Sequence, residues 1–307
     1  MIENSRGAID YDESGTGPTI VLVPGSCSTG AAWRPVITHW NNQFRCVTTS
    51  LLGYGRTAER RTAADTDISY EADVVESVVA RMGEPVHLVG HSFGGLTALA
   101  VALRKRVQLL SLAIIEAPAP EVLRQTAEHQ HYRSFREMSE AYIGAFEAGD
   151  GSAIELMIDF YGGSGTFAAW PERVRGYARQ TTAVNILDWQ TAYGFPLPTA
   201  TLARVEVPTL VLCGGASHPA IRRANELLVQ GMSNASLATL ARAAHFMIST
   251  HPEEVAGIIA QHVADTELGR PGSLCRLASA AEGDPLVSVF RDQAVQLPAA
   301  HDRNSRP

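Results

Sequence analysis

A serine between two glycines joins an apolar segment to a helical one. Residues Val86–Gly95 read VHLVGHSFGG, and the four residues before Gly90 have the length and character of a buried strand. The segment that follows, to about Lys105, has the pattern of a helix. In so tight a turn, side chains two residues either side of Ser92 would collide unless they were glycine. The junction therefore predicts a sharp strand–turn–helix unit that holds the Ser92 hydroxyl out above it.

Short apolar runs alternate with helical patterns along the first half of the chain. Tyr70–Met82 carries valines at helical spacing, and Gly95–Lys105 is the second expected helix. The expected strands are Thr19–Val23, Arg45–Thr49, Val86–Val89 and Leu110–Ile115. Alternation with nearly continuous apolar strands predicts an α/β fold whose central sheet is mostly parallel and covered by helices on both faces.

The pattern changes in the middle of the chain and then resumes. From Glu121 to about Thr201 there are helical stretches but no convincing strand, whereas strands and helices alternate again from Thr209 to Val263. We therefore expect one core domain formed by residues 1–119 and 202–264, with a helical lid at residues 120–201. Residues 265–307 are rich in proline, glycine, arginine and polar residues, which predicts a poorly ordered tail.

Composition excludes several classes of protein. The 307 residues carry a net charge of −7 with scattered basic residues, which argues against a nucleic-acid partner. The 4 cysteines are widely and irregularly spaced, so neither a zinc site nor a disulfide framework is expected. No apolar run approaches the roughly 20 residues that span a bilayer, and the first ten residues do not resemble a signal peptide. A cytoplasmic protein without a metal or membrane partner is expected, and its oligomeric state stays open.

The serine junction resembles the nucleophile elbow of α/β hydrolases. Val21–Ser26 is similar to the strand and oxyanion loop of the esterase, haloperoxidase-like and C–C hydrolase group, and Leu51–Thr57 to its post-strand turn. The resemblance extends over about residues 8 to 264. Pro24 stands where a histidine is common and Ser50 where an aspartate is common, but neither change removes a catalytic group.

This resemblance implies that Ser92 is the nucleophile and that its base lies in the loop after the last strand. His245 occupies that loop, because it follows the strand ending at Leu240 and precedes the helix that starts near Pro252. His251 is the rival and is interpreted as part of the helix cap. His91 cannot turn back to the hydroxyl of its neighbour and is interpreted as a packing residue.

The acid is the member of the triad whose position departs from the usual pattern. Many relatives place an aspartate directly after the strand that corresponds to Thr209–Cys213, but Gly214–Pro219 contains no carboxylate. Other members take the acid from the end of the strand after the nucleophile, where this chain has Glu116. The order Ser92, Glu116, His245 is also the order that the fold uses. The resemblance therefore implies a Ser-His-Glu triad.

The same resemblance implies an oxyanion hole and a pocket. Its donors should be the backbone N–H groups of Phe93 and Ser26. Residues 121–200 hold 12 of the 21 aromatic residues. Most should pack within the lid, but the surplus predicts an apolar substrate pocket. The candidate substrate-binding residues are Trp33, Tyr142, Phe160, Trp170 and Trp189.

These features predict a serine hydrolase of the carboxylesterase class (EC 3.1.1) that cleaves an ester, lactone or thioester of a small, largely apolar molecule. The expected mechanism runs through an acyl-enzyme and uses no cofactor. Because the nucleophile is serine rather than aspartate, dehalogenation and epoxide opening are not expected. A cofactor-free lyase or C–C bond hydrolase on the same triad stays open, since pocket groups set the reaction. A non-catalytic small-molecule binding protein is the remaining alternative.

Overall fold

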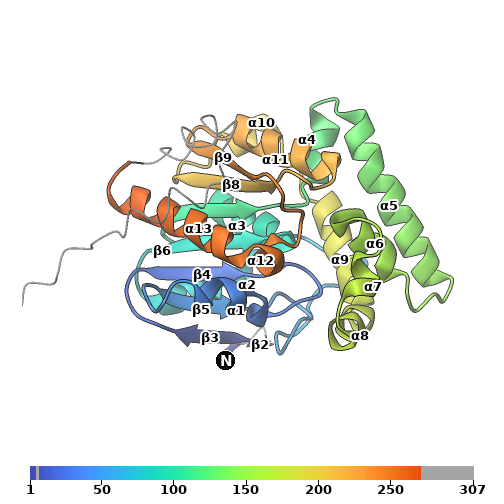
Figure 1. Cartoon of the computed structure of the whole chain (residues 1–307), viewed down its shortest axis with the longest axis horizontal. Coiled ribbons are helices and arrows are strands. Elements are labelled where there is room, and N and C mark those ends of the chain that lie inside the picture. The colour runs from blue at the N-terminus through green and yellow to red at the C-terminus, as the bar shows by residue number, and fades with distance from the viewer. Residues whose placement is uncertain (5–6, 271–307) are drawn as a thin grey trace, which may run out of the picture.

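One seven-stranded sheet forms the centre of the molecule (Figure 1). The computed structural model of the protein describes residues 1–4 and 7–270, so most of the expected tail lies outside the described residues. The strands lie in the order β3-β5-β4-β6-β7-β8-β9, with only β3 antiparallel to its neighbour. They span Tyr11–Ser14 (β3), Thr19–Val23 (β4), Arg45–Thr49 (β5), Val86–His91 (β6), Leu109–Ile115 (β7), Thr209–Gly214 (β8) and Ala235–Leu240 (β9). The predicted mostly parallel α/β sheet is confirmed.

Helices cover both faces of the sheet because strand side chains alternate between two cores. Val21 and Val23 of β4 belong to one core, whereas Ile20 and Leu22 belong to the other. The first core packs against α2 (Ser69–Met82), α3 (Phe93–Arg104) and α11 (Pro219–Gly231). The second packs against α1 (Arg34–Thr38), α12 (Met247–Thr250) and α13 (Pro252–Glu267). A short turn of 3₁₀ helix, η1 (Gly30–Trp33), precedes α1.

The segment between β7 and β8 is helical, as the sequence indicates. Figure 1 shows most of its helices gathered at one end of the sheet. They are α4 (Pro120–Gln125), α5 (His129–Glu147), α6 (Ile154–Gly162), α7 (Thr166–Ala169), α8 (Glu172–Gln180), α9 (Thr182–Tyr193) and α10 (Thr199–Leu202). We call them the helical insertion. Parallel strands end at one edge of the sheet, so an insertion after β7 lies where side chains from several strand ends converge.

The amino-terminal strands escaped the sequence prediction. A hairpin of β1 (Ile2–Asn4) and β2 (Gly7–Ile9) and the edge strand β3 are short, and β3 exposes most of its residues. A strand of three or four residues offers too few positions for a hydrophobic alternation to stand out.

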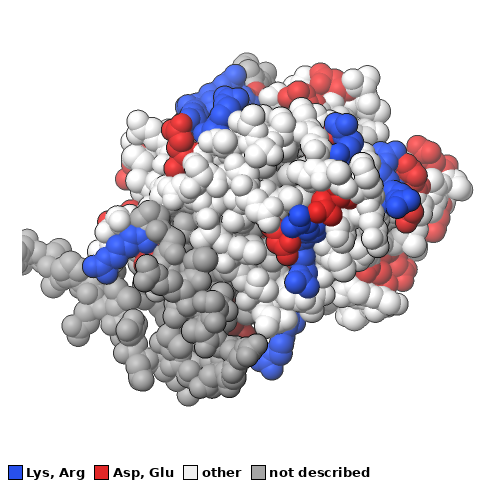
Figure 2. All heavy atoms as spheres, turned by 90° about the horizontal axis from the view of Figure 1, so that it is seen from above, with Lys and Arg blue, Asp and Glu red and all other residues white. Residues whose placement is uncertain are grey.

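The surface mixes charges of both signs. Figure 2 shows basic and acidic side chains side by side at several places on the visible face. Ion pairs such as Arg136–Glu140 and Arg223–Glu128 account for part of this mixing. Among the described helices, none combines the length and apolar character needed to cross a membrane. Cys27, Cys46 and Cys213 are buried and unbridged.

The turn between β6 and α3 is compact, as the two glycines predict. A Cβ atom on Gly90 would lie 2.2 Å from the carbonyl oxygen of Gly94. One on Gly94 would lie 2.3 Å from the carbonyl oxygen of Pro24, at the end of β4. Both contacts are with backbone, which cannot swing aside, so any larger residue would push α3 away from the sheet.

We expect Gly94→Ala to reduce the free energy of unfolding by about 2 kcal/mol or more, because its methyl group overpacks the end of β4. Gly257→Ala is the matched control. Gly257 lies inside α13 with no heavy atom within 4 Å of its added Cβ. Alanine there should raise stability by about 0.5–1 kcal/mol. Urea unfolding of both variants checks this, and equal effects would contradict the steric account of the turn.

Candidate active site

Ser92 stands at the turn between β6 and α3, in a backbone conformation that side-chain-bearing residues rarely adopt. Its φ is 55° and its ψ is −128°. Three backbone hydrogen bonds hold it there: its N–H donates to the Ile115 carbonyl at 2.8 Å, and its carbonyl accepts from the N–H groups of Gly95 at 2.8 Å and Leu96 at 3.2 Å. Such strain persists only where the surroundings enforce it and is concentrated at functional sites. The turn thus fixes the position of the hydroxyl.

His245 lies in the loop between β9 and α12, and its ring reaches the serine. Its Nε2 is 2.9 Å from Ser92 Oγ. The side chain is 2% exposed, so water barely competes for this bond. The ring of Tyr161, from α6, lies against the His245 ring with centroids 4.1 Å apart. The imidazole is therefore confined between the serine and the helical insertion.

His91 holds the loop that carries His245. The Nε2 of His91 is 2.8 Å from the His245 carbonyl oxygen and, as its only possible role toward a carbonyl, donates to it. Burial, together with the nearby His245 ring, lowers the pKa of His91 to about 3. His91 is thus a neutral structural donor, in line with its interpretation as a packing residue.

Glu116 completes the line of contacts from the end of β7. Its Oε2 is 3.1 Å from His245 Nδ1, and its Oε1 accepts the Gly214 N–H at 2.6 Å. Its own N–H donates to the Leu212 carbonyl at 3.1 Å, so β8 holds both its backbone and its side chain. The residue is fully buried and has a φ of 53°. This is the place that the sequence predicted for a carboxylate.

The three side chains form the arrangement in which an imidazole can take a proton from a hydroxyl. A carboxylate on Nδ1 keeps the proton on that nitrogen, which leaves Nε2 free to accept the serine proton. It also stabilises the imidazolium that then forms. The geometry is suited to nucleophilic attack by Ser92 Oγ.

The competing side chains lie elsewhere. The His251 Nδ1 is 2.8 Å from the Thr250 hydroxyl, at the start of α13. Asp159 accepts from the backbone N–H groups of Gly165 and Phe167 within the helical insertion. Neither of these two side chains contacts His245 or Ser92.

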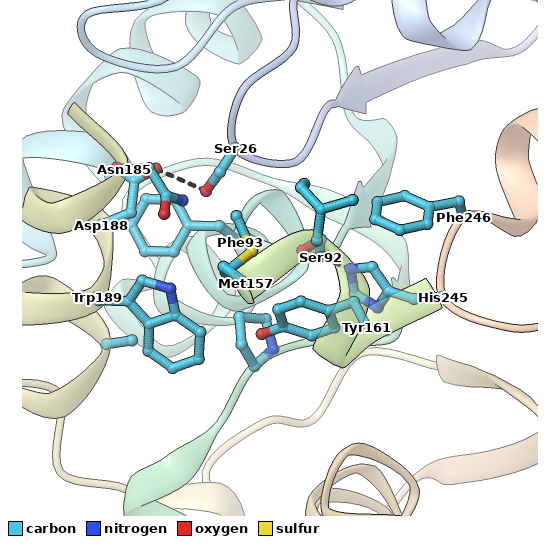
Figure 3. Close-up of a pocket in the computed structure, with 13 residues that line it drawn as sticks. Ser26, Ser92, Phe93, Met157, Tyr161, Asn185, Asp188, Trp189, His245 and Phe246 are labelled. Carbon is cyan, nitrogen blue, oxygen red and sulfur yellow. Dashed lines mark hydrogen bonds between the residues drawn. The ribbon is translucent and has the colours of Figure 1, made fainter. Parts of the chain in front are cut away.

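Asp188 reaches into the site, but on the side away from His245. Its Oδ2 accepts from the Ser26 hydroxyl at 2.6 Å (Figure 3). The same Oδ2 accepts from the Tyr54 hydroxyl at 2.6 Å, and its Oδ1 pairs with Arg61 at 2.7 Å. Asp188 therefore orients Ser26, the residue expected to supply an oxyanion donor. The Ser26 loop approaches Ser92 closely, because a Cβ on Gly25 would lie 2.8 Å from the Ser92 Cβ.

A small cavity of about 40 Å³ lies beside Ser92. In Figure 3, Ser92 lies between His245 and Phe246 on one side and residues of α9 on the other. The lining comes from the core and the helical insertion: Ser26, Ser92, Phe93, Pro118, Met157, Ile158, Tyr161, Asn185, Asp188, Trp189, Ala192, His245 and Phe246. Most of these side chains are apolar, which suits a small and largely apolar molecule.

One of the five aromatic residues expected at the pocket, Trp189, lines it, and the other four do not. Trp170 lies behind Phe246, with ring centroids 4.9 Å apart, and Phe160 lies beside Tyr161 and against His218. Tyr142 is fully buried, and its hydroxyl donates to the Thr182 carbonyl. Trp33 belongs to the core on the α1 and α13 side of the sheet.

These placements correct the expectation for four residues. The side chain of Trp33 packs in the core between the sheet and helices α1 and α13, and Tyr142 packs inside the helical insertion. Neither residue lines the cavity. Trp170 and Phe160 support cavity residues instead of lining the space themselves. An aromatic surplus indicates where a pocket lies but not which rings face it.

The sequence prediction missed Tyr161 and Asn185. Both lie on helix faces that carry other lining residues: Met157, Ile158 and Tyr161 on α6, and Asn185, Asp188, Trp189 and Ala192 on α9. Positions 185, 188, 189 and 192 follow the helical spacing of three, four and seven residues. Starting from Trp189, this periodicity would have pointed to Asn185.

A buried charged network supports the side of the site that Asp188 forms. Arg61 pairs with Asp188, with Glu71 at 3.1 Å and with the partly exposed Glu59 at 2.8 Å. Burial raises the pKa of Glu71 to about 8, against the opposing pull of Arg61. Glu71 Oε1 lies near the guanidinium without an aligned hydrogen bond, whereas its Oε2 accepts from Leu52 N–H. Glu71 therefore binds a proton more tightly than an ordinary glutamate does.

Within residues 1–4 and 7–270, no three histidine, cysteine, aspartate or glutamate side chains are grouped so that they could hold a metal ion. Cys27, which follows Ser26 in the chain, is buried near Asp188, and its burial raises its pKa to about 12. A thiol with that pKa is protonated at neutral pH and is not a competing nucleophile.

The fold and this site define an α/β hydrolase. The chain belongs to the alpha/beta hydrolase family, whose sequence model matches residues 20–258.

Two of the relatives that the chain resembles are named as dehalogenases. It is 34% identical to haloalkane dehalogenase 2 of Mycobacterium tuberculosis over 104 residues, which are 34% of this chain and 36% of that protein. It is 24% identical to fluoroacetate dehalogenase of Burkholderia sp over 274 residues, 83% of this chain and 90% of that protein. The first match thus spans little more than a third of the relative's length.

Solved structures share the fold. A thermophilic esterase from Thermogutta terrifontis superposes with a TM-score of 0.67 at 21% identity, over 86% of this chain and 96% of the esterase chain. At such low identity the likeness establishes the fold and not the substrate.

The raised pKa of Glu71 predicts a pH-dependent stability. Its pKa is about 8 in the folded chain, above the ordinary glutamate value of 4.5, so the folded chain binds the proton more tightly. The contribution of Glu71 to the free energy of unfolding is therefore fully present below about pH 4.5 and is lost as the pH rises through 8. Glu71→Gln removes this titration, so the variant should not show this loss. Between pH 5 and pH 8 the free energy of unfolding of the wild type should therefore fall relative to that of the variant, by up to about 1.4 kcal/mol per pH unit. Urea unfolding across that range checks this, and parallel curves would contradict it.

Proposed function

We propose that the protein is a serine carboxylesterase that hydrolyses an ester, lactone or thioester of a small, largely apolar molecule. The observation that carries the proposal is the line of contacts from Ser92 Oγ through His245 to Glu116, at 2.9 Å and 3.1 Å. The carboxylate is itself held by Gly214 N–H. A hydroxyl, imidazole and buried carboxylate in this order make the serine a nucleophile toward carbonyl carbon.

In the first half of the reaction, His245 Nε2 takes the Ser92 proton as Oγ attacks the carbonyl carbon. The N–H groups of Phe93 and Ser26 receive the oxygen that becomes negative, and each is worth about 3 kcal/mol in comparable enzymes. The imidazolium then gives its proton to the leaving alcohol. Glu116 stays ionised and stabilises the charged ring.

In the second half, water enters from the cavity and attacks the acyl-enzyme. His245 takes a proton from the water, the tetrahedral intermediate collapses, and the proton returns to Ser92 Oγ. The carboxylic acid leaves and the free enzyme is restored.

The helical insertion is proposed to act as a lid. It contributes Met157 and Tyr161 from α6 and Trp189 from α9 to the cavity wall, facing the core residues of the site. A shift of these helices would widen the cavity of about 40 Å³ and admit the substrate. Closure would then exclude bulk water from the reacting carbonyl.

The relatives named as dehalogenases do not favour dehalogenation here. Displacement of a halide by Ser92 Oγ would leave an alkyl ether on the serine. An ether has no carbonyl carbon for water to attack, so the enzyme would not turn over. An acyl-serine is an ester and is hydrolysed by the same groups that form it.

Ser92→Ala and His245→Ala should each lower kcat/KM for short ester substrates by at least about 10³-fold, because the members of a triad act as a unit. Wild-type protein should take up a fluorophosphonate probe, and Ser92→Ala should not. His251→Gln is the matched control, a histidine that contacts Thr250 outside the site, and should retain activity. Labelling of Ser92→Ala at the wild-type rate would reject Ser92 as the nucleophile.

Glu116→Gln tests the unusual position of the acid. The amide keeps the shape of the side chain but lacks the negative charge that stabilises the imidazolium. We expect kcat to fall by roughly 10²–10⁴-fold with little change in KM. Asp159→Asn, a carboxylate of the helical insertion that contacts only backbone N–H groups, is the control and should retain kcat. If kcat survives in Glu116→Gln, the site works as a Ser92–His245 dyad.

A further inference from the structure

Asn185 presents an unsatisfied hydrogen-bond acceptor at the cavity. The residue is 2% exposed. Among the side-chain nitrogen and oxygen atoms of the cavity-lining residues, its Oδ1 is the one that is buried without a hydrogen-bond partner. Figure 3 shows its amide on the α9 side of the cavity, near Phe93 and Trp189 and across from His245. Buried polar atoms are almost always paired, so this one calls for a donor that the protein does not provide.

The polar groups around Asp188 are already committed to one another. The Ser26 hydroxyl donates to Asp188, and Asp188 accepts from Ser26, Tyr54 and Arg61. None of these groups is hydrogen-bonded to Asn185 Oδ1. The acceptor of Asn185 therefore stays available to a molecule in the cavity.

The charges behind Asn185 favour a particular kind of ligand. Arg61 carries the positive charge of the network and faces Asp188, Glu59 and Glu71. One guanidinium thus faces three carboxyl groups, so acidic groups outnumber basic ones in this network. An anionic group beside Asn185 would meet this field and an oxygen that cannot donate. A neutral donor, such as a hydroxyl or an amide N–H, meets neither obstacle.

We infer that Asn185 forms a polar subsite that binds a hydrogen-bond donor on the substrate, so that hydroxylated or amide-bearing esters are preferred over plain esters and over carboxylated ones. The inference rests on the proposed function, since it names the substrate class for the same site. Asn185 is here a specificity-determining residue, distinct from the groups that move protons.

A donor that meets this acceptor should improve kcat/KM by about tenfold, the effect of one net hydrogen bond in a buried site. The acceptor then remains unpaired with any substrate that lacks a donor. A site built to bond a hydroxyl is known to reject the analogue without it much more strongly than a site that only fits its shape.

The first experiment uses the wild-type full chain and pairs of small esters. One series varies the acyl side: ethyl butyrate, its 2- and 3-hydroxy derivatives and the corresponding methoxy compounds. The other series varies the alcohol side: ethyl butyrate, 2-hydroxyethyl butyrate and 2-methoxyethyl butyrate. The methoxy group keeps the oxygen and removes the donor. We expect at least one hydroxy ester to exceed its methoxy counterpart about tenfold in kcat/KM, and monoethyl succinate, which carries a carboxylate, to be poorest. If no hydroxy ester has a higher kcat/KM than its own methoxy counterpart, the inference is overturned.

The second experiment assigns the preference to Asn185. Asn185→Leu keeps the volume and removes the acceptor, so the hydroxy-to-methoxy ratio of kcat/KM should fall to about one. Gln190→Met is the matched control: Gln190 lies on the same helix with an equally unpaired buried amide oxygen, but it lines a different groove. Its ratio should match wild type. A ratio unchanged in Asn185→Leu would overturn the inference.

The two proposals fail in different ways. If wild-type protein hydrolyses none of the esters and takes up no fluorophosphonate, the proposed function fails. If it hydrolyses ethyl butyrate and is labelled, but the donor preference is absent or insensitive to Asn185→Leu, only the subsite is wrong. Because each ratio is taken within one variant, a general loss of activity in Asn185→Leu does not mimic the expected result. If Asn185→Leu does not fold, the wild-type series decides alone.

Discussion

The structure of the site depends on the close backbone packing around Ser92. Gly90 and Gly94 let the first turn of α3 lie directly against the ends of β6 and β4, where a Cβ atom would overlap backbone. This contact forces Ser92 into its positive φ and lifts its side chain out of the sheet. The strain is local, and the cores on both faces of the sheet supply the stability that maintains it.

The other groups of the site are held by the same principle, each at the end of a strand. Glu116 ends β7 and is anchored to β8 through Gly214 and Leu212, while His245 is anchored by His91 from the turn itself. Neighbouring parallel strands therefore set the distances between the three side chains. The opposite wall comes from the helical insertion, whose charged contacts with Arg61 join it to the core. The strand ends hold the proposed catalytic side chains, and the helical insertion shapes the space for the substrate.

Much of this architecture could be predicted from the sequence. β4 and β5 lie where the apolar runs indicated, and the sequence placed Ser92, His245 and Glu116 where strand ends converge. The edge strands β1 to β3 were missed because they are too short to show a period. The orientation of Trp33 and the role of Arg61 could not be predicted, because each depends on contacts between segments far apart in the chain.

The central claim is that Ser92 becomes covalently acylated during turnover. Rapid acid quench during hydrolysis of an ester, followed by proteolysis and mass spectrometry, tests it directly. We expect a peptide that contains Ser92 and is heavier by the mass of the acyl group minus one hydrogen, with the modification on the serine. An adduct on another residue, or turnover in ¹⁸O-labelled water that leaves ¹⁸O in a side-chain carboxylate of the enzyme, would contradict it.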